Sequence, residues 1–433
     1  MEIYDVIIVG CGSAGIGAGI EFEKSKCNIK YLILEGRDRI GGRSFTDMTT
    51  FGAEIPVDLG AHYICHHQEN NFLFKNFLRS DKDFIESDVY DGSIMKIFDR
   101  NGTAISDEII LKSTEIVDGL MRFIRANANL DQDVSIQDLI HSKLEGISDE
   151  QVRNLVNLFL AYTELHEGSD LNQISALSFG RGEADLEETD LSIENGLGNV
   201  VKQIADKYQL PIKLHSIVTN IDISNDFVCV KTKDQQIYKC KYVLITIPLG
   251  CLKTKTIQFH PELPRWKQDA IEQMGFSLLN KVYLQFSNIF WEKHLRRITV
   301  LDERFKFYYC LPEYSMLALY ISGSIARQLE NLTDEQMINE IVHSLRRIYP
   351  QITQPTKWLI TRWSQDPFSF GSYSSFHRGN TIETLEDLSK DTHQGKIHWA
   401  GEHTNFNGCI GYVDSGFESG FREGKALLSK LQL

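Results

Sequence analysis

Three glycines near the N-terminus have the spacing of a phosphate-binding turn. Gly10, Gly12 and Gly15 form the pattern G-x-G-x-x-G, with Ala14 directly before the last glycine. Such glycines let the chain turn tightly, let the backbone approach a pyrophosphate, and let a helix pack closely on a strand. The phosphate then binds the free amides and the positive end of the following helix. The spacing predicts that a nucleotide pyrophosphate binds at this turn.

A carboxylate follows at the distance that a dinucleotide site requires. Glu35 lies about 20 residues beyond Gly15, the offset of the acidic residue that accepts both ribose hydroxyls. This arrangement implies an adenosine ribose without a 2′-phosphate. A second glycine turn with arginines comes next: Gly36, Arg37, Gly42 and Arg43. An arginine here can add charge to a pyrophosphate that a helix end alone would hold more weakly.

The elements that must position these residues lie in the same stretch. Residues 3–9 form an apolar, β-branched run of strand length, and residues 16–24 have a helical pattern. A second apolar strand is expected over 31–34, so that Glu35 stands at its end. Strand, turn, helix and strand together predict a Rossmann-like unit.

Composition limits the classes of function. The chain has 433 residues, which suits two domains rather than one core. Its 42% hydrophobic and 24% charged residues are ordinary for a soluble enzyme. The net charge of −14 argues against a nucleic-acid partner. Either attraction of cationic small molecules or solubility alone explains that charge.

Cysteine usage and the first residues predict a cytoplasmic protein. The eight cysteines are dispersed without a Cys-x-x-Cys pair, so neither a zinc site nor a disulfide framework is expected. Cys65, His66 and His67 are adjacent, but no second ligand cluster accompanies them, and we expect no metal. The first strand begins almost at Met1, which leaves no room for a signal peptide. No apolar stretch reaches the ~20 residues of a membrane span.

The stretch that follows Glu35 resembles the FAD-dependent amine oxidase superfamily, whose members carry Arg-x-Gly-Gly-Arg there. The matching residues are Arg39-Ile40-Gly41-Gly42-Arg43. A second segment, 257–291, resembles polyamine oxidases and lysine-specific histone demethylases. The resemblance extends over nearly the whole chain and is weakest between about 70 and 190. It implies FAD as the cofactor and an amine as the substrate.

The resemblance also implies which residues contact the cofactor. In the family, a Leu-Gly-Ala element places amides against the flavin, one residue packs by the adenine, and a carboxylate contacts the ribityl chain or pyrophosphate. The C-terminal helix, expected from about 411 to 430, aims its positive end at the flavin. The corresponding positions are Gly60, Ala61, His62, Val218, Trp363, Gly401, Glu402, Tyr412 and Val413. Ser372 stands where monoamine oxidases have a flavin-linked cysteine, so the FAD is expected to be non-covalent.

Three further residues match the family's catalytic positions. By pattern alone, Lys281 is an ordinary exposed lysine, because residues 281–286 alternate like a strand with one apolar face. The resemblance instead implies a buried lysine that holds a water against flavin N5 and assists the reaction with oxygen. Burial would lower its pKa. Tyr373 and Tyr412 match two aromatic positions that form a sandwich over the flavin and admit an amine.

The expected fold class is α/β. We predict a Rossmann-like FAD-binding domain of the GR2 type from 1–75, 195–265 and 380–433, interleaved with an α+β substrate-binding domain from 76–194 and 266–379. Most of 70–168 is expected to be helical, including 108–126 and 149–165, and a strand is expected over 214–221. The acidic run 183–190 either lines a cation entrance or is merely solvated.

The predicted function is FAD-dependent oxidation of an amine, with a polyamine favoured. A hydride passes from the amine to flavin N5, the resulting imine gives an aldehyde, and oxygen becomes hydrogen peroxide. The alternatives are a monoamine oxidase, an amino-acid oxidase, or a flavin-binding protein without amine turnover. Where polyamine oxidases have Trp-x-His, this chain has Tyr63 and Cys65. The expected partners are a small amine and O2, without nucleic acid or membrane; the oligomeric state is not predicted.

Overall fold

The first sheet contains the N-terminal strand that the sequence predicts. In the computed structural model, β1 (Ile3–Val9) pairs in parallel with β2 (Tyr31–Leu34) on one side and β12 (Ile237–Ile245) on the other. The sheet has eight strands in the order β13-β10-β11-β12-β1-β2-β9, with β21 also paired to β12. The other strands are β9 (Ile212–Lys213), β10 (Val218–Asp222), β11 (Val228–Thr232), β13 (Gln258–His260) and β21 (Ile397–Trp399). The structure describes residues 2–64, 71–78, 88–89, 94–127, 132–181, 191–223, 226–406 and 410–431.

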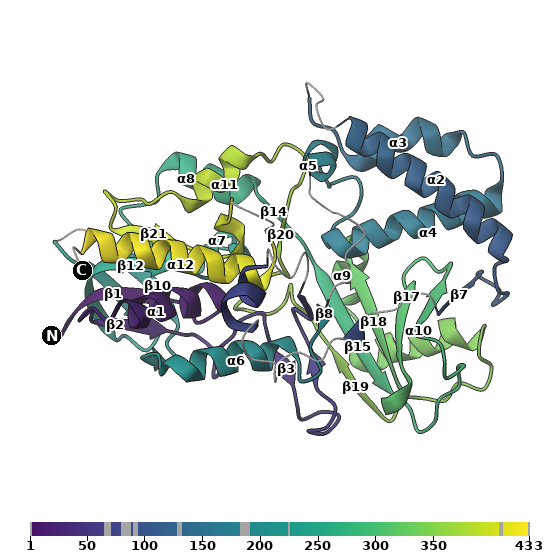
Figure 1. Ribbon diagram of the computed structural model, residues 1–433, viewed down its shortest axis with the longest axis horizontal. Coiled ribbons are helices and arrows are strands. Elements are labelled where there is room, and N and C mark those ends of the chain that lie inside the picture. The colour runs from purple at the N-terminus through teal and green to yellow at the C-terminus, as the bar shows by residue number, and fades with distance from the viewer. Residues whose placement is uncertain are drawn as a thin grey trace.

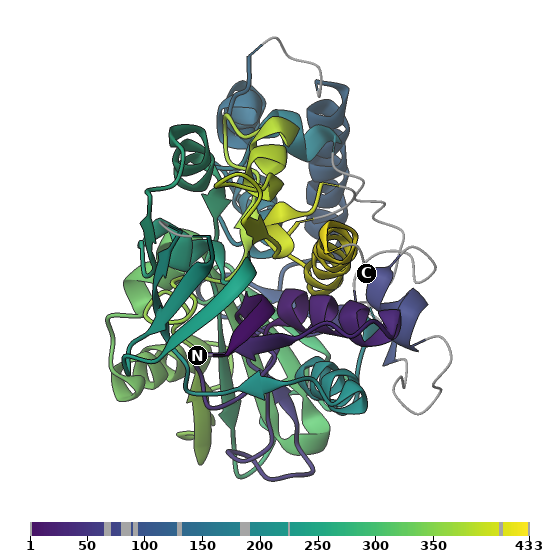
Figure 2. The same cartoon turned by 90° about the vertical axis from the view of Figure 1, so that its left-hand side faces the viewer.

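Two helices from opposite ends of the chain pack together on this sheet. α1 (Ser13–Ser25) and α12 (Val413–Lys430) lie side by side in both views (Figures 1 and 2). Glycine allows this contact, because a Cβ on Gly420 would lie 2.1 Å from the carbonyl oxygen of Ala14. α1 begins three residues before the predicted start, since the glycine turn itself already enters the helix.

The second sheet has six strands in the order β19-β15-β18-β17-β16-β7. They are β7 (Met95–Phe98), β15 (Leu279–Gln285), β16 (Arg297–Val300), β17 (Phe307–Leu311), β18 (Met316–Ser322) and β19 (Lys357–Ile360). The prediction that β15 has only one buried face is wrong. Val282 and Leu284 pack in a core with α10 (Asp334–Arg346), while Tyr283 packs in another core with α4 (Glu150–Glu167). Helices therefore cover both faces of this strand.

Further helices surround the two sheets (Figure 1). They are α2 (Asp107–Ala126), α3 (Ile136–Glu145), α5 (Ala176–Arg181), α6 (Leu197–Tyr208), α7 (Leu249–Lys253), α8 (Arg265–Gln273), α9 (Gly323–Leu329) and α11 (Ile382–Ser389). The helices predicted over 108–126 and 149–165 are confirmed as α2 and α4. The stretch 70–168 also contains β7, which the helical prediction missed. The strand predicted over 214–221 begins only at Val218, because His215 has φ +55° in the preceding turn.

Short paired strands and turns connect the two sheets. The strands are β3 (Thr46–Asp47) with β4 (Val57–Asp58), β5 (Tyr63–Ile64) with β8 (Leu191–Ser192) and β6 (Asp88–Val89), and β14 (Gly275–Phe276) with β20 (Ser374–Ser375). Helical turns occur at Phe74–Leu78, Pro312–Tyr314 and Glu402–Thr404. Each sheet combines segments that are far apart in sequence, and the domain boundaries given above stay a prediction. Within the described ranges, no helix is both long and apolar enough to cross a bilayer.

A buried lysine closes the C-terminal end of α11. The Nζ of Lys267 donates to the carbonyl oxygens of Asp387, Leu388 and Lys390 at 2.6, 2.9 and 2.8 Å. It also lies 4.6 Å from the ring centroid of Trp399. The last carbonyls of a helix have no partner within the helix, so this ammonium satisfies groups that would otherwise be buried without a donor.

Replacing Lys267 by methionine should therefore destabilise the fold. The variant keeps the length of the side chain but leaves carbonyls buried without a donor, and we expect the free energy of unfolding to fall by about 3 kcal/mol. Urea unfolding followed by circular dichroism measures it. Lys390→Met is the control, because the Lys390 side chain forms an ion pair with Asp387 at the surface and its replacement should cause no measurable change. Equal stability of the two variants would contradict this role of Lys267.

Candidate functional site

A cavity of about 1570 Å³ is lined by residues of both sheets, and is called the central cavity below. It exceeds the ~300–1,000 Å³ that one small ligand usually occupies. Nearly all the predicted site residues line it. They are Gly10, Gly12, Ala14, Glu35, Gly36, Arg37, Gly42, Arg43, Gly60, Ala61, His62, Val218, Lys281, Trp363, Tyr373, Gly401, Glu402, Tyr412 and Val413. Gly15 alone of the predicted set lies outside its lining.

The glycine turn leaves one open side toward the central cavity. Gly10 has φ +108°, and a Cβ on Gly15 would lie 2.1 Å from the Gly10 carbonyl oxygen, so Gly15 serves close packing inside the turn. A Cβ on Gly12 would have no atom within 4 Å. Since Gly12 lines the cavity just before α1 begins, this open side can admit a group that binds the amides of the helix start.

Glu35 lies at the end of β2 and is 7% exposed. One carboxylate oxygen accepts a hydrogen bond from the Cys11 amide at 2.7 Å, and the other accepts from the Arg37 amide at 2.9 Å. Each oxygen of an ionised carboxylate can accept more than one hydrogen bond. Glu35 is therefore fixed by the turn and can still accept hydroxyl groups from a ligand.

Two of the three arginines after Glu35 line the central cavity. Arg37 forms a salt bridge with Asp366 at 2.6 Å, and Arg43 forms one with Glu402 at 2.9 Å. Arg39, outside the lining, donates instead to the carbonyls of Ile40 and Gly42. Arg37 and Arg43 are therefore the arginines available to an anionic ligand.

Glu402 connects Arg43 to the start of the C-terminal helix. One of its oxygens accepts from Arg43 and from Ser374 Oγ, and the other accepts from the Gly411 amide at 2.9 Å. α12 begins at Val413 with Tyr412 as its N-cap, as the sequence predicts. Its positive end lies at the cavity, where a group with partial negative charge would be stabilised.

Lys281 is 3% exposed and lies against the Leu-Gly-Ala segment. Its Nζ donates to the carbonyl oxygens of Gly60 at 2.7 Å and Asp58 at 3.0 Å. Burial lowers the pKa of Lys281 to about 8, although the charge of Asp58 opposes that shift. Trp363 Nε1 donates to the Leu59 carbonyl between them at 3.0 Å. Donors from the second sheet and its flanking loop thus fix three successive carbonyls of a cavity wall.

Asp58 carries a set of contacts that sequence reasoning missed. Its carboxylate, 1% exposed, accepts from Thr46 Oγ1 at 2.5 Å, from His62 Nδ1 at 3.2 Å and from the first amides of α6, Leu197 and Gly198, at 3.0 and 3.4 Å. Burial alone would raise the pKa of Asp58, but the hydrogen bond from His62 and the nearby charges lower it. His62 is only four residues away, but Leu197 and Gly198 are about 140 residues away, so no local pattern could have revealed the whole cluster.

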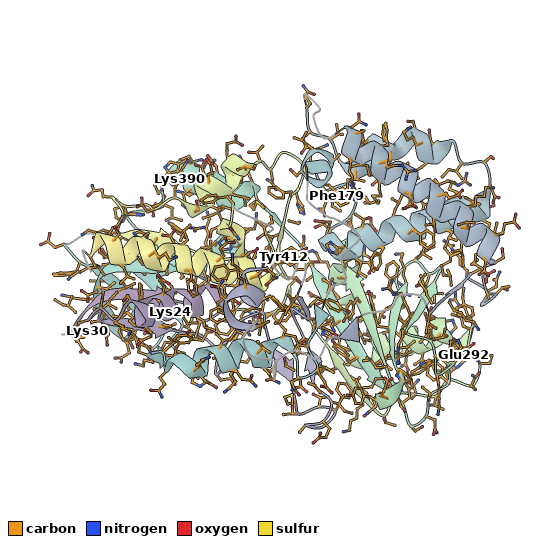
Figure 3. All side chains as sticks on the ribbon, in the orientation of Figure 1. Lys24, Lys30, Phe179, Glu292, Lys390 and Tyr412 are labelled. Atoms are coloured by element: carbon orange, nitrogen blue, oxygen red, sulfur yellow. The ribbon has the colours of Figure 1, made fainter. Side chains whose placement is uncertain are left out.

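Five tyrosines form another part of the lining of the central cavity. Tyr162, Tyr309, Tyr320, Tyr373 and Tyr412 line it, and this group is called the aromatic chamber. Tyr373 donates its hydroxyl to the His166 carbonyl at 2.8 Å. Figure 3 shows Tyr412 where α12 begins, near the middle of the molecule. Glu167, at the end of α4, also lines the cavity; the helix pattern gave no signal for this carboxylate.

Two features that the sequence singled out lie outside the described residues. They are the adjacent Cys65, His66 and His67, and the acidic run 183–190. In the part of the chain that is described, no group of three His, Cys, Asp or Glu side chains could hold a metal. Cys11, Cys27, Cys229, Cys240, Cys251 and Cys310 are free thiols.

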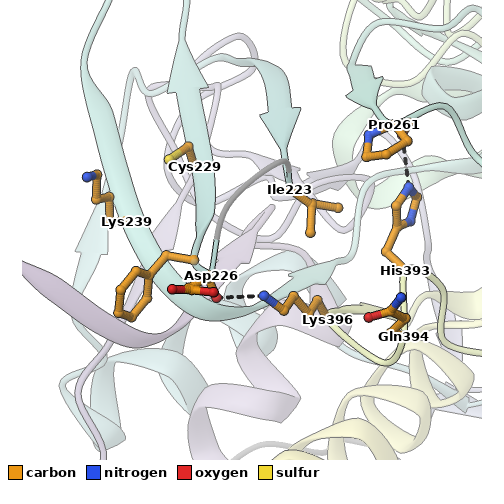
Figure 4. A pocket seen from close by; sticks show the side chains of 9 residues that line it. Ile223, Asp226, Cys229, Lys239, Pro261, His393, Gln394 and Lys396 are labelled. Carbon is orange, nitrogen blue, oxygen red and sulfur yellow. Dashed lines mark hydrogen bonds between the residues drawn. The ribbon is translucent and has the colours of Figure 1, made fainter.

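A second hollow of about 800 Å³ lies apart from these residues (Figure 4). Lys396 donates to the Asp226 carbonyl at 2.6 Å, and a ring nitrogen of His393 lies 2.8 Å from the Pro261 carbonyl. None of the predicted site residues lines it. The site residues predicted from the sequence therefore lie at the central cavity and not at this hollow.

Comparison with known proteins supports an amine-oxidising site. Residues 24–428 match the family described as flavin containing amine oxidoreductase. Polyamine oxidase 5 of Oryza sativa subsp. japonica is 28% identical over 441 residues, covering 96% of this chain and 86% of that protein. Lysine-specific histone demethylase 2 of Homo sapiens is 29% identical over 430 residues, covering 92% of this chain and 50% of that protein.

The fold also matches a solved structure. A putrescine oxidase redesigned in its cofactor binding aligns with a TM-score of 0.78 and 20% identity, covering 98% of this chain and 99% of that one. This agreement confirms the predicted α/β fold class. Together with the family match over residues 24–428, it identifies the chain as an oxidoreductase that acts on amines and belongs to the flavin-containing amine oxidoreductase family.

Proposed function

We propose that this chain is an FAD-dependent oxidase of cationic amines, with polyamines as the favoured substrate class. The observation that carries the proposal is the continuity of the central cavity, which joins the glycine turn and Glu35 to the aromatic chamber. One end has the groups that recognise a dinucleotide, and the other has the aromatic walls that suit an amine. A dinucleotide and a substrate would thus share one enclosure.

The residues of the cavity fit FAD. The open side of Gly12 gives a pyrophosphate access to the start of α1, and Arg43 supplies charge nearby. Glu35 would accept the ribose hydroxyls, Val218 would lie by the adenine, and the start of α12 would face the flavin ring. Ser372 Oγ donates to the Leu279 carbonyl at 2.9 Å and accepts from the Leu279 amide at 2.8 Å. Because both hydrogen bonds hold the Ser372 hydroxyl and no cysteine stands at this position, the residue supports non-covalent binding of the FAD.

When bound, the flavin supplies the acceptor for the hydride of the amine. The protein's own residues would then hold the substrate and exclude water. Tyr373 and Tyr412 would orient the amine between their rings, and the buried Tyr309 and Tyr320 would help to exclude water from it. Lys281 would place a positive charge behind the Gly60 segment and assist electron transfer to oxygen, which forms hydrogen peroxide. The imine product would hydrolyse to an aldehyde.

Two features support a polyamine. Glu167 lines the cavity from the end of α4, where its carboxylate can attract a second ammonium group of a long substrate. The net charge of −14 would also draw polycations toward the protein.

The relatives include both polyamine oxidases and histone demethylases, so a lysine side chain of a peptide is the second candidate for the substrate. An amino-acid oxidase is less favoured, because His62 follows the Leu-Gly-Ala segment where a permanent cation would be needed for a carboxylate.

The substrate class can be tested by anaerobic bleaching of the flavin absorbance of the purified protein. The panel contains spermine, spermidine, acetylated polyamines, aromatic monoamines, amino acids and a lysine-methylated peptide. We expect one class of polyamine to bleach the flavin fastest, and admitted air to restore the colour with release of hydrogen peroxide. If only another class of amine bleaches the flavin, that class replaces polyamines as the proposed substrate. If no amine bleaches it, the proposed oxidase activity is contradicted.

The cofactor cradle can be tested with alanine at Gly12. Its φ of −82° suits alanine and the new Cβ has open space, so the fold should keep its stability. That Cβ would occupy the space expected for the pyrophosphate, and we expect the purified variant to lose most of its bound FAD. The ratio of flavin absorbance to protein concentration measures the bound FAD, and the melting temperature, measured in parallel, shows whether the fold keeps its stability. Gly146→Ala, at a helix end away from the cavity, is the control; full FAD content in Gly12→Ala would contradict the cradle.

The role of Lys281 can be tested with methionine. Oxygen takes on negative charge as it is reduced, so loss of this ammonium should slow flavin reoxidation about a hundredfold and leave anaerobic reduction nearly unchanged. Because the pKa of Lys281 is about 8, wild-type reoxidation should slow as the pH rises through that value. Stopped-flow mixing with oxygenated buffer measures both effects. Lys253→Met is the matched control, since burial also lowers the pKa of Lys253 to about 8 but the residue lies outside the cavity lining. Unchanged reoxidation in Lys281→Met would refute the role.

A further inference from the structure

We propose that His62, oriented by Asp58, is the base that takes the proton of the cationic amine before hydride transfer. The inference rests on the proposed function and adds a catalytic residue to it. His62 was expected only to contact the cofactor through its place after Ala61. The structure gives its side chain a buried carboxylate partner and a place on the cavity wall.

The geometry is that of a histidine held at one nitrogen. His62 Nδ1 lies 3.2 Å from Asp58 Oδ2, and the exposed fractions of the two side chains are 29% and 1%. The ring also meets Tyr63 edge to face, with centroids 4.4 Å apart. One edge of the imidazole is therefore directed at a buried anion, while the side chain keeps part of its surface open at the central cavity.

The surroundings of Asp58 determine which nitrogen of His62 carries the proton. The carboxylate accepts from Thr46 and from two amides at the positive end of α6, which favours its ionised form. An ionised carboxylate only accepts hydrogen bonds, so Nδ1 must be the donor. In a neutral ring, Nε2 then carries the lone pair and can accept a proton.

The reaction needs such a base. An alkyl ammonium has a pKa of about 10, so the substrate arrives as a cation at neutral pH. Hydride loss next to a positive nitrogen would produce a second positive charge, whereas a neutral amine has a lone pair that stabilises the carbon. In the proposed step, one N–H bond of the ammonium breaks and one N–H bond forms at Nε2; no electrons leave either molecule. The imidazolium beside Asp58 later returns the proton to solvent.

Other groups near His62 are less suited to this step. Lys281 approaches Asp58 from the second sheet, but its ammonium donates to the carbonyls of Asp58 and Gly60. His166 also lines the cavity, but its side chain is 56% exposed, and the carboxylate of Glu167, 3.7 Å away, belongs to a side chain that is itself 25% exposed. His62 alone of these groups combines a fixed tautomer with a place on the cavity wall.

The test is the rate of anaerobic flavin reduction in His62→Gln from about pH 6 to about pH 10, with the amine that bleaches the wild type fastest. We expect a loss of about a hundredfold at pH 7 and recovery toward the wild-type rate near pH 10, where the free amine predominates. A structural or cofactor-binding role would lower the rate equally at every pH. A loss that does not depend on pH, or no loss, would therefore overturn the proposal.

Matched variants separate the possible causes. His141→Gln removes a histidine from an exposed pair with Glu145 and should keep the wild-type pH profile. Asp58→Asn should shift the profile in the same direction as His62→Gln, and added imidazole should restore part of the rate of His62→Ala at pH 7. Flavin content, measured for each variant, identifies loss of cofactor. If no amine bleaches the flavin of the wild type itself, the proposed oxidase activity is contradicted, and not the role of His62 as the base.

A second measurement does not depend on turnover. Nitrogen NMR of the protein labelled in histidine, assigned with His62→Gln, reports which ring nitrogen is protonated. We expect His62 to have its proton on Nδ1 and a lone pair on Nε2 in the oxidised protein at pH 8. The opposite tautomer, or an imidazolium that keeps its charge at pH 8, would overturn the proposal even if the variant is slow.

Discussion

The buried contacts of Asp58 join the two halves of the protein. Its carboxylate closes the start of α6 on the first sheet, and its carbonyl oxygen accepts from Lys281 and Tyr283 on the second sheet. A buried carboxylate is tolerated only when it is well hydrogen-bonded, so these partners must all be in place together. The wall from Leu59 to Ala61 is consequently fixed from both sides, and the position of a flavin against it would be set by the junction.

The same junction explains why buried polar side chains gather at this wall of the cavity. Lys281, Tyr283 and Trp363 are buried, yet each donates to a carbonyl of residues 58–60. A backbone that leaves its own sheet loses the regular ladder of hydrogen bonds, and side chains must replace it. The irregular path of this segment therefore requires donors, and one of them is a lysine whose charge serves the proposed chemistry.

Local parts of the fold could be predicted from the sequence, while contacts over long separations could not. The glycine turn and the start of α12 depend on neighbours within a few residues, and Glu35 follows from the regular spacing of one strand-turn-helix-strand unit. The burial of Lys281 could not be seen in the alternation of β15, because α4 and α10 cover its two faces. Asp58 and Glu167 were missed for a similar reason: each looks like an ordinary polar residue until distant elements bring partners or a cavity to it.

The packing of α1 on α12 has a consequence for biosynthesis. The surface of α12 that covers α1 is made about 400 residues after α1 itself. Contacts between such distant segments raise the contact order and slow folding. Until α12 is made, the face of α1 that packs on it stays uncovered and can associate with chaperones or with other chains. Cofactor capture would then be a late event, because the two helix ends that face it come together only after α12 has been made.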